Sequence, residues 1–168
     1  MKKSIILSML FLFAFVIVKA QIIKPKITAG LSGVYSMPQE DFSRQYKYGA
    51  GGEVYGGVGW GKTFLLATIG YKVYKEQDSV KTGSFTTIPV KLGIKQLLFM
   101  KRVFVQGDAG IITTRVGNFS SSGFTYDIGA GLRFAGLEAG LFYAAFKIDN
   151  AKKFTTVLNA KLGYTFTL

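Results

Sequence analysis

The chain has 168 residues, with 21 Lys and Arg against nine Asp and Glu, and it contains 21 Gly but neither Cys nor His. Without Cys it forms no disulfide, thiolate zinc site, cysteine nucleophile or lipoprotein anchor, and without His it lacks the commonest general base and metal ligand. We therefore expect no enzyme, and neither a catalytic, cofactor nor metal site. The formal charge of +12 indicates an anionic partner, either nucleic acid or a membrane surface.

Residues 1–20 have the features of a cleaved signal peptide. Lys2 and Lys3 precede an apolar stretch over residues 4–18, and compact residues at 18 and 20 suit signal peptidase. A membrane anchor is the alternative, but the stretch is shorter than the roughly 20 residues that a spanning helix needs. Cleavage after Ala20 leaves residues 21–168 as one exported domain with 18 basic and nine acidic residues, a net charge of +9. Export argues against nucleic acid as a partner.

Apolar residues alternate with polar residues or Gly along most of the mature chain, which predicts β-strands. Residues 62–74 are less clear, because Phe64, Leu65 and Leu66 are apolar on both faces. We include that segment because the spacing of its neighbours requires a strand. The eight expected strands, in chain order, lie near residues 27–35, 48–58, 62–74, 87–95, 103–111, 124–134, 137–145 and 154–168.

The connections between these strands differ in length in a regular way. We expect long connections over residues 36–46, 75–84 and 115–123, an intermediate one over 149–153, and short ones over 59–61, 97–101 and 135–136. Long loops at one end and short turns at the other are typical of up-and-down outer-membrane barrels, whose short turns are periplasmic.

The two faces of the strands differ in chemistry. One face carries Leu, Ile, Val and Ala without central charges, whereas the other combines Gly with charged residues. Lipid requires an apolar outer wall, and a narrow barrel interior has room for Gly and a few paired charges. We therefore predict an all-β, eight-stranded, antiparallel, up-and-down transmembrane β-barrel, closed because an open edge in hydrocarbon leaves backbone groups without partners. Ala130→Arg or Leu141→Arg should block assembly, while Gly131→Ser should be tolerated better.

Strand parity places a set of charged residues inside the barrel. We expect them to form a neutral network of ion pairs, because buried charges persist only when they are paired. A narrow gated ion path and a protease-like carboxylate pair are the alternatives. The remaining positive charge would lie on the rims and face anionic headgroups. The predicted lumen residues are Glu53, Lys91, Lys95, Asp108, Asp127, Arg133, Glu138 and Lys161.

Aromatic residues gather near both ends of the predicted strands, as in the interfacial girdles of membrane barrels. Trp60, Phe99, Phe134 and Phe166 lie near the short turns. The residues expected near the long connections are Tyr46, Tyr48, Phe124, Tyr126, Tyr143 and Phe154.

The C-terminal octet Lys-Leu-Gly-Tyr-Thr-Phe-Thr-Leu, residues 161–168, resembles the β-signal of bacterial outer-membrane proteins. Its signal positions are Lys161, Gly163, Phe166 and Leu168, although an aromatic residue is usual at the last position. The resemblance implies recognition by the barrel assembly machinery, which reads an exposed edge strand.

With residues 20–21, 87–93 and 127–132, this octet makes the mature chain similar to the small outer-membrane β-barrel family of Bacteroidetes, a porin-family group related to OmpX-type and OmpA-type barrels. The resemblance implies a monomeric, non-enzymatic protein in the cell outer membrane of a Gram-negative bacterium. It would have a structural or surface-interaction role, with outer-membrane lipid and lipopolysaccharide as partners. A narrow porin-like channel and a soluble periplasmic lipocalin-like binder are the alternatives. The loop cations expected to meet lipopolysaccharide are Arg44, Lys75, Lys81, Arg115, Lys152 and Lys153.

Overall fold

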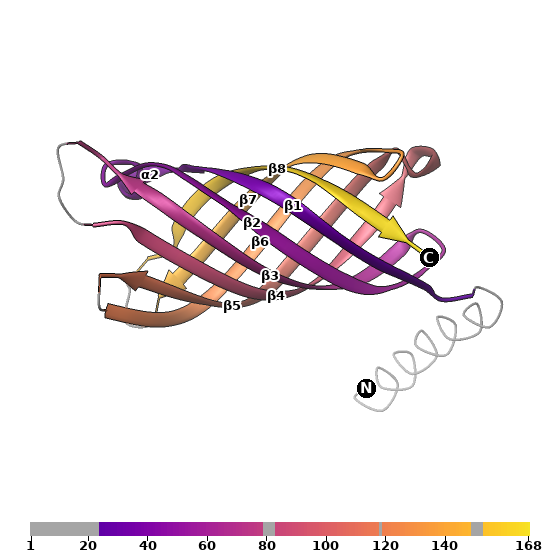
Figure 1. The fold of residues 1–168 in the computed structure, drawn as a ribbon, viewed down its shortest axis with the longest axis horizontal. Coiled ribbons are helices and arrows are strands. Elements are labelled where there is room, and N and C mark those ends of the chain that lie inside the picture. The colour runs from indigo at the N-terminus through magenta and orange to yellow at the C-terminus, as the bar shows by residue number, and fades with distance from the viewer. Residues whose placement is uncertain (1–23, 79–82, 118, 149–152) are drawn as a thin grey trace, which may run out of the picture.

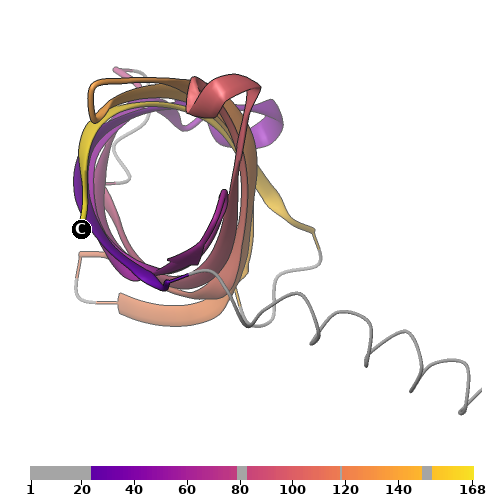
Figure 2. The same ribbon diagram turned by 90° about the vertical axis from the view of Figure 1, so that its right-hand side faces the viewer.

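A computed structural model describes residues 24–78, 83–117, 119–148 and 153–168; the predicted signal peptide of residues 1–20 lies outside these ranges. Eight antiparallel strands form one closed barrel in chain order (Figures 1 and 2), which confirms the predicted fold. The strands are β1 (Lys26–Pro38), β2 (Tyr46–Trp60), β3 (Thr63–Glu76), β4 (Phe85–Leu98), β5 (Val103–Val116), β6 (Phe119–Phe134), β7 (Leu137–Ile148) and β8 (Thr155–Thr167).

The barrel has two unlike ends. The long-loop end carries the connections β1–β2, β3–β4, β5–β6 and β7–β8, and includes the short helix α2 (Glu40–Ser43). The short-turn end carries the other three connections, including a 3-10 helix over Phe99–Lys101. Strand β1 begins at this end and strand β8 ends there (Figure 1). In the part of the chain that the structure describes, no helix is long and apolar enough to cross a membrane.

Two sequence predictions about the long-loop end are wrong. Residues 115–123 form no long connection, because β5 continues to Val116 and β6 starts at Phe119, and the serines at 120–122 are paired with residues 113–115 across the hairpin. Tyr46 does not belong to an outer girdle: its side chain is 2% exposed and points inward. A register irregularity between Tyr46 and Tyr48 reverses the parity of the strand at that point.

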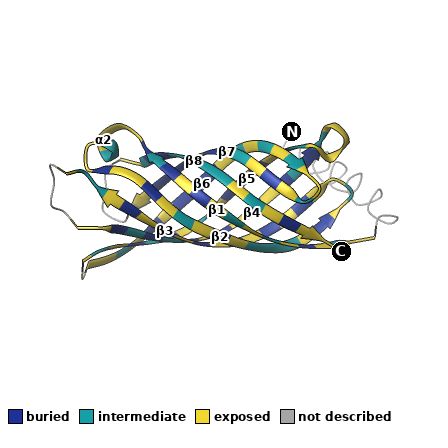
Figure 3. Ribbon diagram, turned by 45° about the horizontal axis from the view of Figure 1, so that its top comes forward, coloured by how far each residue is buried: buried dark blue, intermediate teal, exposed yellow. Residues whose placement is uncertain are grey.

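Burial alternates along most of each strand between a covered inner face and an exposed outer face (Figure 3), although residues 144–146 of β7 and 156–157 of β8 are buried in succession. The ambiguous segment is strand β3, which shows the strictest alternation. Phe64 and Leu66 are buried in the barrel, whereas Leu65 points outward and is half-exposed. Both faces of β3 are therefore apolar near the short-turn end for different reasons, since one contacts the lumen and the other the surroundings.

Glycines on the inner face make room for large side chains on the neighbouring strand. Gly59 is the register partner of Phe64, and a Cβ atom at Gly59 would lie 2.3 Å from the Phe64 ring. A Cβ atom at Gly131 would lie 2.3 Å from the backbone oxygen of Ala139 and 2.5 Å from the ring of Phe104. A side chain at position 131 would therefore crowd the backbone, which cannot yield as a flexible side chain can. That Gly131→Ser is tolerated better than Ala130→Arg or Leu141→Arg stays a prediction.

Candidate functional site

The lumen is closed at the long-loop end by a cluster that we call the aromatic plug. Phe42 of α2 packs over it, with ring centroids 4.8 Å from Tyr46, 5.2 Å from Tyr74 and 5.4 Å from Phe85. Such spacings are those of favourable aromatic pairs. The connection β1–β2 thus folds back and seals the barrel. The buried members of the plug are Tyr46, Tyr74, Phe85, Ile112, Ala144, Phe146 and Val157.

Four predicted lumen residues from four strands form a closed cycle of ion pairs, which we call the four-charge ring. Lys91 Nζ lies 3.2 Å from Glu53 Oε1 and 2.5 Å from Asp127 Oδ2. Lys161 Nζ lies 2.6 Å from Glu53 Oε2 and 3.3 Å from Asp127 Oδ2. Each ammonium contacts both carboxylates, so every charge in the ring is offset twice. The two carboxylates are bridged by lysines and do not share a proton as a protease dyad would.

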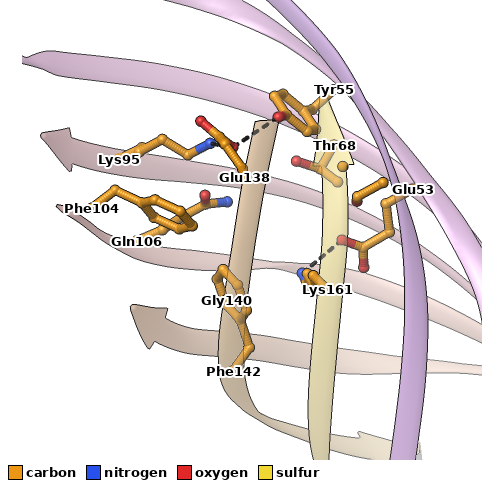
Figure 4. Close-up of a pocket in the computed structure, with 12 residues that line it drawn as sticks. Glu53, Tyr55, Thr68, Lys95, Phe104, Gln106, Glu138, Gly140, Phe142 and Lys161 are labelled. Atoms are coloured by element: carbon orange, nitrogen blue, oxygen red, sulfur yellow. Dashed lines mark hydrogen bonds and ion pairs between the residues drawn. The ribbon is translucent and has the colours of Figure 1, made fainter. Parts of the chain in front are cut away.

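A second group, which we call the Glu138 cluster, lies nearer the short-turn end (Figure 4). Lys95 Nζ donates to Glu138 Oε2 at 2.7 Å, and the Tyr55 hydroxyl donates to the same oxygen at 3.1 Å. Arg133 Nε lies 3.7 Å from Glu138 Oε1. Lys95 also lies over the rings of Tyr55 and Phe104, with Nζ 4.8 Å and 4.9 Å from their centroids. This cluster therefore has one acid for two cations, whereas the four-charge ring has two acids for two cations.

Asp108 is the one predicted lumen residue for which the described part of the chain shows no ion pair. Its two carboxylate oxygens accept from Gln106 Nε2 at 3.0 Å and 2.9 Å. Gly93 leaves space for this carboxylate, because a Cβ atom at Gly93 would collide with it. All eight predicted residues thus lie on the inner face, and seven of them belong to the two ion-pair groups.

Sequence reasoning missed one lumen cation, Lys72 of β3, which is 4% exposed. Parity could not assign it, because its segment is apolar on both faces. Its electrostatic neighbours are Glu53, Asp127 and Lys91, and Gly51 provides the space for its stem. Among the described residues, the lumen therefore holds five cations against four acids, so the predicted neutral sum is wrong by one charge. The signal available in the sequence was that Thr68, Gly70 and Lys72 share one parity, opposite the apolar residues at 69, 71 and 73.

A small cavity of about 30 Å³ separates the four-charge ring from the Glu138 cluster (Figure 4). Thr68 and Glu138 line it, and both Thr68 Oγ1 and Glu138 Oε1 are buried without a hydrogen-bond partner. This space suits about two water molecules, which would satisfy those two oxygens. It offers no wide path for hydrated ions. A second apolar cluster consists of Phe64, Leu66, Leu97, Phe104 and Phe142, and its Phe104 and Phe142 also line the cavity.

Strand β4 passes through all these layers in order. From the long-loop end, its inward residues include Phe85 of the plug, Lys91 of the ring, Lys95 of the Glu138 cluster and Leu97 of the second apolar cluster. Apolar layers thus cover the ionic layers on both sides. Among the described residues, no group of acidic side chains could hold a metal ion.

Three residues of the predicted assembly signal, Lys161, Gly163 and Phe166, lie on the closing strand β8, which pairs with both β7 and β1, and Leu168 follows directly after the strand. Lys161 and Gly163 face the lumen, where Lys161 belongs to the four-charge ring. Phe166 and Leu168 are exposed at the short-turn end. The recognition of this segment by assembly machinery stays a prediction.

Comparisons with known proteins identify the fold. No protein-family model matches the sequence, and no curated protein matches it either. The crystal structure of Ail, the attachment invasion locus protein of Yersinia pestis, has a TM-score of 0.57 and 16% identity over 86% of this chain and 100% of Ail. Ail in complex with the heparin analogue sucrose octasulfate has a TM-score of 0.60 and 15% identity over the same shares.

The N-terminal β-barrel domain of Pseudomonas aeruginosa OprF gives a TM-score of 0.59 and 10% identity over 83% of this chain and 97% of that domain. These structural neighbours are small outer-membrane barrels of eight strands. The likeness at such low identity concerns the fold.

Proposed function

We propose that the chain is an integral outer-membrane β-barrel protein with a structural or surface-interaction role, without catalysis and without a conducting pore. The distribution of side chains between the two faces of the wall carries the proposal. Large apolar residues such as Leu92, Ile128 and Leu141 are 58–66% exposed on the outside, while charged residues are buried inside. Water would oppose both placements, whereas a bilayer around the barrel favours them. A soluble binding barrel would have the reverse arrangement.

The filled lumen supports a closed barrel in preference to a narrow porin-like channel. The aromatic plug closes the long-loop end, the rings of the second apolar cluster pack against the ionic groups, and the cavity between those groups has a volume of only about 30 Å³. A hydrated ion would have to displace buried rings and break ion pairs to pass. Eight-stranded barrels are generally filled by their own side chains.

The long-loop end supplies the surface for interaction with lipopolysaccharide. Arg44, Lys75, Arg115 and Lys153 are exposed there, whereas the predicted contacts Lys81 and Lys152 lie outside the described residues. The related fold of Ail has been seen with a polysulfated heparin analogue. By analogy, the exposed cations of this chain would bind phosphate groups of lipopolysaccharide through charge-assisted hydrogen bonds. The Bacteroidetes-type origin and export by a signal peptide belong to the same proposal.

Membrane insertion is tested with a pair of variants at one outward position. The wild-type chain should fractionate with outer membranes and show heat-modifiable mobility on gels. Leu141→Arg should fail to insert, because a cation near the middle of the lipid-facing wall costs about 2–4 kcal/mol. Leu141→Phe should insert normally. Recovery of wild type in the soluble fraction, or equal insertion of both variants, contradicts the proposal.

The closed lumen and the surface role need separate measurements. Planar-bilayer recordings should show no conductance steps. Such steps would contradict the closed barrel and indicate a channel. Binding to lipopolysaccharide-containing vesicles should fall when Lys75 and Arg115 are both changed to Gln, with Lys75→Arg and Arg115→Lys together as the control. Loss of binding in that control as well would argue against a role for charge alone.

A further inference from the structure

The mouth of the barrel at the short-turn end is an open cavity of about 390 Å³, which we call the cationic bowl. Its floor includes Phe64 and Leu97, which separate it from the lumen. Figure 2 views the barrel from this end, with the β4–β5 connection beside the opening. The bowl is lined by four cations from three separate parts of the chain: Lys26, Lys101, Arg102 and Arg133.

These cations have no acidic residue beside them in the lining of the bowl. Arg133 is partly engaged, because its Nη2 donates to Thr167 Oγ1 at 3.1 Å and its Nε lies 3.7 Å from Glu138 Oε1. Within the described residues, Lys26, Lys101 and Arg102 form no ion pair. Like charges that converge on one cavity repel one another, and a bound anion would relieve that repulsion.

Acidic residues are absent from the whole short-turn rim that the structure describes. Glu138 is the nearest acid, and it lies in the lumen, where Lys95 and Tyr55 hold it. The described acidic residues outside the lumen all lie at the long-loop end: Glu40, Asp41, Glu76 and Asp78. The short-turn end is therefore selectively cationic and does not simply share the general basic character of the chain.

The backbone at the β4–β5 connection is held in an uncommon conformation that brings two of the cations to the bowl. Phe99, Met100 and Lys101 have φ values of 39°, 56° and 66°, in the left-handed region that side chains other than Gly rarely adopt. The backbone N–H of Arg133 donates to the carbonyl of Arg102 at 2.7 Å, which fixes this turn against β6. Backbone outliers of this kind cluster at active sites, ligand clamps and switch regions.

We propose that the cationic bowl binds a multivalent phosphate-type anion. Two guanidinium groups and two ammonium groups around one cavity match the charge and the acceptor geometry of phosphate oxygens. The phosphate belongs either to a soluble compound in the adjacent aqueous space or to a lipid headgroup at the rim. The inference is independent of the proposed surface role, since the bowl and the loops lie at opposite ends of the barrel.

The test uses the folded barrel without its predicted signal peptide, in an uncharged detergent, with pyrophosphate as the probe in titration calorimetry. We expect saturable binding to one site, weakened by added salt. A double variant, Lys101→Asn with Arg102→Gln, should weaken binding about tenfold or more because it removes two charge-assisted contacts. Asn suits position 101 because it tolerates the left-handed backbone there. Lys26→Gln, in strand β1, provides an independent variant if the altered turn does not fold.

The matched control removes two cations from the other end, by changing Lys75 and Arg115 to Gln, and should leave pyrophosphate affinity unchanged. If both double variants weaken binding equally, net charge alone explains the effect and the proposal is overturned. Absence of binding at millimolar pyrophosphate would overturn it as well. A second arm repeats the titration in nanodiscs. Weaker pyrophosphate binding with phosphatidylglycerol than with phosphatidylcholine supports a lipid headgroup as the source, and equal binding supports a soluble phosphate.

Discussion

The long-loop and short-turn ends of this barrel deal with charge in opposite ways. At the long-loop end, acids and bases lie together: Arg44 Nε is 3.8 Å from Asp41, Lys47 pairs with Asp78, and Glu76 accepts from the backbone of Gly83 at 2.7 Å. An aromatic plug closes the lumen beneath them. At the short-turn end, the mouth is open and its lining is cationic. The surplus positive charge is therefore not spread evenly over the rims, and the end with the shorter connections has the less compensated charge.

The two ionic groups of the lumen also differ in charge balance, since the four-charge ring is neutral and the Glu138 cluster has one surplus cation. Removing one lysine from each group should reveal the difference in stability. Lys91→Met removes a cation that two buried carboxylates share, so the free energy of unfolding should fall by on the order of 3–5 kcal/mol. Lys95→Met should cost less, because Glu138 keeps its bond from Tyr55 and its proximity to Arg133. Urea unfolding of the two variants in phospholipid vesicles measures the difference. A larger loss for Lys95→Met would contradict the tighter coupling that we assign to the four-charge ring.

Truncation of an apolar side chain should also destabilise the barrel more at the plugged end than at the open end. Phe85→Ala leaves a cavity among aromatic rings and should cost about 3–4 kcal/mol. Leu97→Ala, at the floor of the cationic bowl, should cost about 2 kcal/mol, because water from the bowl can fill the space and reduce the cavity contribution. Unfolding midpoints at equal denaturant slope provide the comparison. If Leu97→Ala is the more damaging of the two, the floor is packed as rigidly as the plug.

Two inner glycines of β2 allow the two ends to be compared by adding a methyl group instead of removing side-chain atoms. A Cβ atom at Gly49 would lie 2.6 Å from the Tyr74 ring, inside the plug, and one at Gly59 would lie 2.3 Å from the Phe64 ring, beside the bowl. Gly49→Ala should destabilise by about 1–3 kcal/mol, whereas Gly59→Ala should cost less because Phe64 has space to shift. Thermal gel-mobility assays rank the two variants. Equal losses would indicate that the open end is as crowded as the closed one.

The smallest effect concerns the surface pair of the long-loop end. The hydrogen bond and charge of Lys47 hold the pKa of Asp78 below its ordinary value. Because this folded-state pKa is lowered, the stabilisation is present above the unfolded aspartate pKa and is lost as pH falls through the folded value. Lys47→Met should raise the pKa of Asp78, as followed by NMR titration of its carboxyl carbon. An unchanged titration, or one insensitive to salt in wild type, would show that the pair does not persist in solution.

Strand periodicity was sufficient to predict the closed barrel and the inward placement of eight charged residues, because a face exposed to lipid and a face filled with side chains impose different chemistry at every second residue. It failed where that contrast disappears. Lys72 lies in a strand that is apolar on both faces. Residues 120–122 are polar on both faces, yet they continue the β5–β6 hairpin through backbone pairing. Tyr46 was assigned to the wrong face because one irregular residue reverses parity.

The cationic bowl had no periodic signal at all. Its cations come from the start of β1, the β4–β5 connection and the end of β6, and only the closure of the barrel brings them to one mouth. Composition shows how many cations the chain has, but the sequence pattern does not show which of them lack an acid nearby. Distances across the barrel axis decide that.

The closing seam between β1 and β8 has a kinetic consequence. It pairs Thr28 with Thr167, 139 residues apart in the sequence, so this contact has a large loop-closure cost. Lys161 reaches Glu53 and Asp127 from the closing strand, so half of the four-charge ring is incomplete until the last strand docks. Folding should therefore be slow, because the edges of β1 and β8 stay unpaired until a late step. A urea-jump experiment should find that changes at the seam slow refolding more than changes of equal cost in the β2–β3 hairpin.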